Sequence, residues 1–148
     1  MNIKTFDGDL IHFFRRVSIP MARFGLFIVF FWFGILKVLD LSPATPLVEK
    51  LFTHTVPVMS FGTFIIFFGL LEMVIGIFFL IKGMERIVIP LLLLHMVTTF
   101  LPLFILPQVT WTGFLIPTLE GQYIIKNFVI IACAIGIAAQ LHPLKKIQ

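Results

Sequence analysis

Five ionisable residues lie inside long apolar runs or at their edges: Arg23, Lys37, Glu72, His95 and Lys126. A charged side chain at membrane depth faces the interior of a helix bundle or a water-filled cavity, and it pairs with another polar group. A carboxylate accepts hydrogen bonds or a proton, and a lysine ammonium group donates hydrogen bonds. These residues are therefore the candidates for a ligand-binding site or a proton-accepting group.

Each of these residues also has a purely structural interpretation. Glu72 can be a paired group that holds helices in register, and Lys37 and Lys126 can extend their stems to water at the membrane surface. Arg23 fits an anchor on the basic side of the membrane. His95 fits a hydrogen-bonded core residue. The sequence leaves both interpretations open.

Four apolar runs must position these residues, and they cover residues 20–39, 61–81, 87–106 and 123–141. A helix of about 20 residues matches a hydrocarbon core of about 30 Å. The runs lack the alternation of a membrane barrel strand. Only 12% of the residues are charged, well below the roughly 25% of a soluble domain. The sequence predicts an all-α integral membrane four-helix bundle, with residues 1–148 as one transmembrane domain.

The basic residues predict how this bundle is oriented. Lysine and arginine gather before the first run, between the second and third runs, and in the tail. The segments 40–60 and 107–122 together contain one, Lys50. Because short cytoplasmic loops are enriched in lysine and arginine, we expect both termini in the cytoplasm. Thr45-Pro46, read as an N-cap followed by proline, predicts a short helix on the outer interface, and 107–122 is expected to be an interfacial loop.

Helical spacing places the polar and small residues of each run on one face. The aligned residues are Arg23, Phe27, Phe30, Gly34 and Lys37 in the first run, Gly62, Gly69, Glu72 and Gly76 in the second, His95, Thr98 and Pro102 in the third, and Lys126, Val129, Cys133, Gly136 and Gln140 in the fourth. Small residues let helices approach closely, so we expect these four faces to pack together. From the rise of about 1.5 Å per residue, Glu72 and His95 lie at similar depth, with Lys37 and Lys126 near the outer surface. The sequence predicts an outward-facing polar pocket with Glu72 at its floor.

Several activities are not expected from this sequence. A haem site in a bundle needs two axial ligands, and His95 is the only histidine within a run. Paired metal-ligand spacing, a P-loop and a G-x-S-x-G motif are absent, as is a basic stripe with interleaved aromatic residues. We therefore expect no metal site, no nucleic-acid partner and no independent enzyme activity, although a quinone site would leave no simple motif.

Three stretches of the chain carry a family resemblance. They are RFGLFIVFFWFGILKVLDLSPATPLV at 23–48, GLLEMVIGIFFLI at 69–81 and TLEGQYIIKNFVIIACAIGI at 118–137. They resemble the first, second and last helices of the DoxX-like membrane proteins, and they are most similar to the YkgB branch, which is linked to resistance to reactive chlorine species. The residues that match the family pattern are Arg23, Lys37, Glu72 and Lys126.

The resemblance implies a four-helix bundle in the inner membrane and an association with quinone-linked or thiol-linked oxidation. We therefore expect an accessory inner-membrane protein of redox or oxidative-stress physiology that binds a small amphiphile, such as a quinone head group, in the outward pocket. It could serve as a subunit of a quinone-linked oxidoreductase. Membrane lipid, a redox partner protein and a second copy of the chain are the other expected partners. Two alternatives stay open: a transporter of a small solute or lipid, and a non-catalytic membrane assembly factor with a structural polar core.

Overall fold

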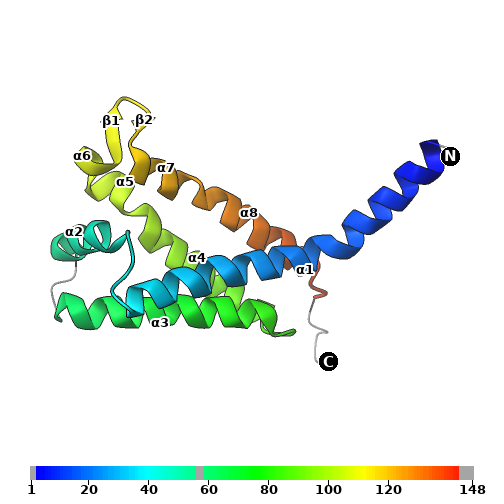
Figure 1. Cartoon of the computed structure of the whole chain (residues 1–148), viewed down its shortest axis with the longest axis horizontal. Coiled ribbons are helices and arrows are strands. Elements are labelled where there is room, and N and C mark those ends of the chain that lie inside the picture. Colours follow the sequence, from blue (N-terminus) through cyan, green and yellow to red (C-terminus); the bar gives the residue numbers. More distant parts are fainter. Residues whose placement is uncertain (1–2, 56–58, 144–148) are drawn as a thin grey trace.

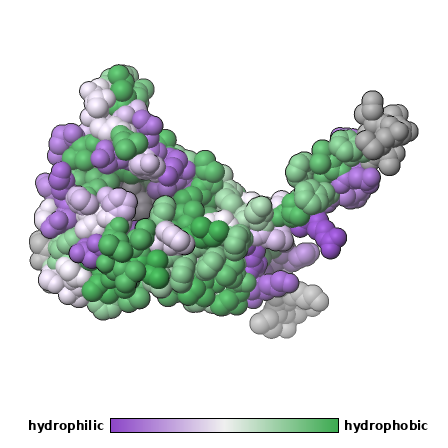
Figure 2. Space-filling view, viewed as in Figure 1, coloured by the Kyte–Doolittle hydropathy of each residue, from purple (hydrophilic) through white to green (hydrophobic). Residues whose placement is uncertain are grey.

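A computed structural model describes residues 3–55 and 59–143 of the chain. Within them, four helical segments are long and apolar enough to cross a membrane: Phe6–Val38, Phe61–Leu80, Glu85–Ile105 and Leu119–Ala138. Helices satisfy their own backbone hydrogen bonds, which lipid cannot do for them. In Figure 2 the middle of the bundle presents mostly hydrophobic residues, and hydrophilic residues gather towards its ends. The chain is a multi-pass membrane protein built as a bundle of helices.

Helices α1 (Ile3–Val38) and α3 (Phe61–Leu80) form the most extensive pair and run antiparallel, side by side (Figure 1). Their backbones touch where two glycines meet. A β-carbon on Gly34 would lie 2.5 Å from the carbonyl oxygen of Gly69, and one on Gly69 would lie 2.7 Å from that of Gly34. Glycines at an interface allow this close approach. The prediction that the small-residue faces of the first two runs pack together is confirmed.

One end of the bundle carries most of the connecting structure. The elements there are α2 (Thr45–Thr55), α5 (Pro102–Ile105), α6 (Pro107–Thr110), β1 (Trp111–Gly113) and β2 (Ile116–Pro117). The two strands form a short antiparallel hairpin, where the sequence predicted a loop. We call this end the hairpin end. The opposite end holds the connection 81–84 between α3 and α4 (Glu85–Phe100), and we call it the turn end.

Helix α2 confirms the predicted short helix but not its predicted cap. The carbonyl of Ala44 accepts from the backbone N–H of Val48 at 3.1 Å, so Ala44 is the N-cap and Thr45 is the first helical residue. Thr45 itself lies inside the helix, and its hydroxyl makes no hydrogen bond within the described residues. Proline at the second helical position is still tolerated, because its missing N–H is one that the first turn leaves unpaired anyway.

The third and fourth spans are interrupted, where the sequence predicted continuous helices. Helix α4 ends at Phe100, just before Pro102, which begins α5. A proline lacks the N–H of a helix interior and disfavours helical geometry in the residue before it. The fourth span starts earlier than residue 123, at α7 (Leu119–Ile125), and continues after Lys126 as α8 (Asn127–Ala138). The hydroxyl of Thr118 caps α7 by accepting from the Gly121 N–H at 3.1 Å.

The first span differs most from its prediction. Helix α1 begins at Ile3 rather than near residue 20, and its first part points away from the bundle (Figure 1). Pro20 lies inside this helix. A proline in a helix interior removes a hydrogen bond and bends the helix. Only the part of α1 after this proline packs into the bundle.

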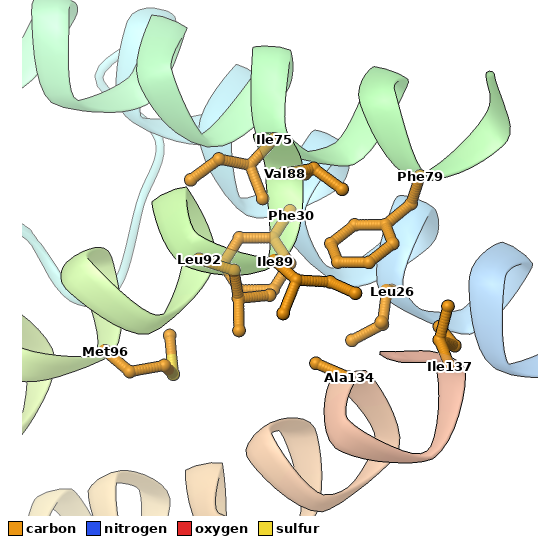
Figure 3. Close-up of a cluster of buried hydrophobic side chains, with 10 residues drawn as sticks. All are labelled: Leu26, Phe30, Ile75, Phe79, Val88, Ile89, Leu92, Met96, Ala134 and Ile137. Atoms are coloured by element: carbon orange, nitrogen blue, oxygen red, sulfur yellow. The ribbon is translucent and has the colours of Figure 1, made fainter. Parts of the chain in front are cut away.

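The apolar core lies where α1, α3, α4 and α8 meet (Figure 3). Its buried members are Leu26, Phe30, Ile75, Phe79, Val88, Ile89, Leu92, Met96, Ala134 and Ile137. Ile75, Phe79, Val88 and Leu92 are completely inaccessible. Lipid is as apolar as these side chains, so close packing rather than the hydrophobic effect holds the helices together here. This core lies between the hairpin end and the turn end, and it separates two groups of buried charges.

Candidate functional site

Three ionisable side chains from three helices meet inside the bundle towards the hairpin end. The Lys37 ammonium group on α1 donates to Glu72 Oε2 on α3 at 2.6 Å. His95 Nε2 on α4 lies 3.4 Å from the other carboxylate oxygen, Glu72 Oε1. All three residues are at most 5% exposed. The sequence predicted that Glu72 and His95 lie at the same depth, and this contact confirms it. We call these three residues the buried triad.

Aromatic rings enclose the triad. Phe30 contacts His95 edge-on with ring centroids 5.7 Å apart, and Phe68 lies 4.9 Å from the same imidazole. The Lys37 ammonium group lies 5.8 Å from the centre of the Phe68 ring, within the range of a cation–π interaction. These rings exclude lipid and lower the local dielectric, which strengthens the attraction between opposite charges. The triad is therefore a desolvated ion pair with a histidine on its carboxylate.

The histidine retains an unused hydrogen-bonding atom. Nδ1 of His95 is buried and has no hydrogen-bond partner among residues 3–55 and 59–143. A neutral imidazole has one N–H and one lone pair. In the tautomer with its proton on Nε2, the N–H is on the side of Glu72 and the lone pair of Nδ1 is left without a donor.

Lys37 also belongs to a groove that opens at the hairpin end. The groove has a volume of about 450 Å³. Its lining residues are Lys37, Val38, Asp40, Thr45, Glu49, Phe61, Gly62, Ile65 and Ile66. They come from the end of α1, from α2 and from the start of α3. One residue of the buried triad therefore reaches the wall of an open groove, whereas Glu72 and His95 do not line it.

The charges around this groove limit which kinds of head group it could accommodate. The charge of Lys37 is already matched by Glu72 at 2.6 Å, and the two other ionisable groups of the wall, Asp40 and Glu49, are acidic. A carboxylate or phosphate head group would meet two acidic side chains with no free cation opposite them. A neutral head group with hydrogen-bond acceptors fits this wall better, because its long chain could follow the apolar side chains of α3.

Lys126 does not join the triad, which corrects the predicted pocket with two lysines. It lies at the junction between α7 and α8, its side chain is exposed, and its ammonium group lies 4.0 Å from the centre of the Tyr123 ring. The cause is the rotation of α8 about its axis. Ala134 and Ile137 face the core, whereas Val129 is 71% exposed. Of the face predicted for the fourth run, Lys126, Val129, Gly136 and Gln140 are exposed, and only Cys133 contacts another helix.

A second ionic contact lies at the turn end. Arg23 on α1 pairs with Glu85, the first residue of α4, and its Nε donates to the carbonyl of Phe79 on α3 at 2.7 Å. The Phe79 carbonyl lies in the last turn of α3, where backbone carbonyls have no N–H partner within the helix. One guanidinium group thus connects three helices at this end. Arg23 is distant from the triad along α1 and is not part of the groove.

Replacing Arg23 with lysine is expected to lower the free energy of unfolding by about 2 kcal/mol, because one ammonium group cannot reproduce both charge-assisted contacts of the planar guanidinium. Equilibrium unfolding in mixed micelles measures this loss. Arg15→Lys is the matched control, since Arg15 is exposed on the same helix and should change stability by less than about 0.5 kcal/mol. Equal effects of the two substitutions would contradict the role of Arg23.

Sequence reasoning missed Glu85 and the acidic groove residues. Glu85 falls just before the predicted start of the third run at residue 87, so the sequence predicts it in the connection between the second and third runs. Its depth at the turn end equals that of Arg23, and this match is a signal that would have paired them. Asp40 and Glu49 gave no such signal, because α2 brings Glu49 to the groove only in the folded chain.

Other chemistry finds little support in the described part of the chain. No group of three or more histidine, cysteine, aspartate or glutamate side chains there could hold a metal ion. Cys133 is a free thiol, half-buried on α8, and its sulfur lies 3.9 Å from the carbonyl of Ala22.

Comparisons with protein-family models, with curated proteins and with solved structures found no match. The geometry and chemistry of the groove and triad therefore carry the functional assignment.

Proposed function

We propose that this multi-pass membrane protein binds the neutral polar head of a small amphiphile, such as a quinone, in the groove at the hairpin end. The observation that carries the proposal is that Lys37 belongs both to the buried triad and to the wall of the groove. Its ammonium group donates to Glu72 inside the bundle, and the same residue lines the open groove. An ammonium group has three donors. Lys37 uses one on Glu72 and one on the Phe33 carbonyl at 3.5 Å, so one is left to donate to a carbonyl oxygen of a ligand.

The proposed setting is the inner membrane, with both termini in the cytoplasm. Lys82 and Arg86 at the turn end and the single lysine of the segment 40–60 support this orientation. The groove would then open outwards, and α2 would lie on the outer interface. The proposed role is that of an accessory protein in redox or oxidative-stress physiology, and it rests on the resemblance of the stretches around Arg23, Lys37, Glu72 and Lys126 to DoxX-like proteins.

A thermal unfolding series tests the binding step. Short-chain quinones are added to the purified protein in detergent, and the midpoint of unfolding is followed by circular dichroism. A ligand at 100 times its Kd stabilises the folded state by about 2.7 kcal/mol, which raises the midpoint by roughly 5–10 °C for a chain of this size. The same measurement is made with dialkyl phospholipids of the same chain length. A quinone site should leave the midpoint unchanged with these lipids, whereas a general lipid site should raise it.

Two variants locate the ligand. Gly62→Ile fills the groove, because a β-carbon on Gly62 meets nothing within 4 Å and Gly62 lines the groove wall. It should abolish the quinone-induced shift while leaving the unliganded midpoint nearly unchanged. Val97→Phe is the control, since Val97 lines a separate apolar groove of similar size between α4, α5 and α8. A shift that survives Gly62→Ile, or no shift with any quinone, would end the proposal.

The mutual pairing of Lys37 and Glu72 favours one second candidate, an assembly factor whose polar core is structural. Lys37 and Glu72 satisfy each other, and both side chains are at most 7% exposed. In that case added quinones would leave the unfolding midpoint unchanged in both the unsubstituted chain and Gly62→Ile, whereas substitutions within the triad would still lower it. The same series of measurements therefore separates the two functions.

A further inference from the structure

The first part of α1, residues 6–17, is amphipathic, unlike the apolar remainder of the helix. Around a helix of 3.6 residues per turn, its large apolar side chains fall within an arc of about 160°, which also contains Asp7. They are Phe6, Leu10, Ile11, Phe13, Phe14 and Val17. The opposite side carries Asp9, His12, Arg15 and Arg16. Figure 2 shows both kinds of surface on this extension, which projects from the bundle.

The apolar face of this segment is uncovered. Phe6, Phe13 and Phe14 are each more than 50% exposed, and Leu10 is 39% exposed. The bundle does not cover them, because the segment points away from the other helices (Figure 1). A soluble surface rarely leaves such a row of large apolar side chains unpartnered. The face is therefore free to contact a partner outside the described chain.

The length of α1 places this segment outside the hydrocarbon core. The helix has 36 residues, which is about 54 Å at 1.5 Å per residue. The part from Pro20 to Val38 already accounts for about 28 Å, close to the roughly 30 Å of the core. The segment before Pro20 must therefore continue past the membrane or turn along its surface.

We propose that residues 6–17 of α1 lie in the plane of the bilayer surface at the turn end, with their apolar face among the acyl chains and their arginines on anionic lipid head groups. Three observations favour lipid over a protein partner. The helix runs directly into a membrane span, so the bilayer is within reach. Pro20 leaves the carbonyl four residues earlier, that of Arg16, without its helical donor, which allows the bend. Arg15 and Arg16 are exposed and on the polar side.

The charge of the turn end agrees with an anionic surface. Lys82 and Arg86 are exposed at this end of the bundle. Arginine and lysine near a membrane surface attract acidic lipids, and each contributes about a fivefold preference. An amphipathic helix with these features lies with its apolar face about 5–10 Å deep at the boundary between head groups and acyl chains. The segment would thereby fix the angle at which α1 enters the membrane.

Spin-label accessibility on the whole protein tests the proposal. Cys133 is first replaced by alanine, and single cysteines are then introduced as Phe6→Cys, Asp9→Cys, His12→Cys and Phe13→Cys. The labelled proteins are placed singly in nanodiscs that contain phosphatidylglycerol. For each label, the rate of collision with oxygen is divided by the rate of collision with a water-soluble nickel chelate. This ratio should be several-fold higher for labels at 6 and 13 than for labels at 9 and 12, because oxygen concentrates in the acyl chains.

A charge series completes the test. Replacing Arg15 and Arg16 with glutamine should lower the ratio of docked to free segment by about fivefold per arginine in anionic nanodiscs, with little change in phosphatidylcholine alone. Asp7→Asn and Asp9→Asn are the matched controls and should favour docking. Equal nickel accessibility at all four positions would mean that the segment extends into water. Spin–spin broadening that appears only when two copies share a disc would assign the face to a second copy. Either result overturns the proposal.

Discussion

Replacing Lys37 with methionine is expected to lower the free energy of unfolding by about 3–5 kcal/mol. The substitution keeps the length and most of the volume of the side chain but removes the charge opposite Glu72, which is 5% exposed. A carboxylate left alone in a desolvated site has no partner for its charge, and breaking a buried ion pair on one side costs this much. Equilibrium unfolding in mixed detergent micelles, followed by circular dichroism, measures the change.

A double substitution tests the physical reason. Lys37→Met combined with Glu72→Leu removes both charges, and an apolar pair of similar volume is often as stable as the ion pair that it replaces. The double variant should therefore recover most of the loss. Lys50→Met on α2 is the matched control, because Lys50 is exposed; its effect should stay within about 0.5 kcal/mol. A double variant that is as unstable as the sum of the single ones would show that the two residues act independently.

Replacing Gly69 with alanine is expected to lower the free energy of unfolding by roughly 3 kcal/mol. The added β-carbon would lie 2.7 Å from the carbonyl oxygen of Gly34 and 3.0 Å from the β-carbon of Lys37. Both obstacles belong to the packed helix α1, so the two helices must move apart, and overpacking of this kind costs about 1–3 kcal/mol. The displacement also lengthens the contact between Lys37 and Glu72, which places the expected loss at the upper end of that range.

Gly25→Ala is the matched control for this prediction. Gly25 lies on α1, in the same helix as Gly34, and a β-carbon there meets nothing within 4 Å. Alanine is the better helix former, so this substitution should be neutral or stabilising by up to about 1 kcal/mol. The two variants are compared by the same unfolding measurement. A loss of equal size at Gly25 would attribute the effect to helix propensity rather than to contact between helices.

The membrane-spanning character of the chain follows from the sequence because hydropathy is a local property. A run of about 20 apolar residues must cross the bilayer whatever its neighbours do. The ends of the helices are less predictable from the sequence, because they depend on single residues. Pro102 ends α4 early, and Thr118 starts α7 before the predicted residue 123. The short helix α2 was also predictable, since Pro46 favours a helix start.

The triad was only partly predictable. The rise per residue gives the depth of Glu72 and of His95, and their contact at 3.4 Å agrees with it. The sequence did not predict where the Lys37 side chain points, because a long flexible stem near a helix end can reach either to water or to a buried carboxylate. Its choice of Glu72 depends on the close packing of Gly34 against Gly69, which brings α1 and α3 into contact.

Depth in the membrane was therefore determined by the sequence, and the rotation of each helix about its own axis was decided by the tertiary structure. The fourth span shows the reason. It is apolar around most of its circumference, so the few polar residues of its sequence do not identify the face that packs inwards. Packing of Ala134 and Ile137 against α1 and α4 decided that face and left Lys126 outside the triad. The depths of Arg23 and Glu85 match in the sequence, but the rotation of α1 and α4 in the folded bundle decided that the two side chains meet.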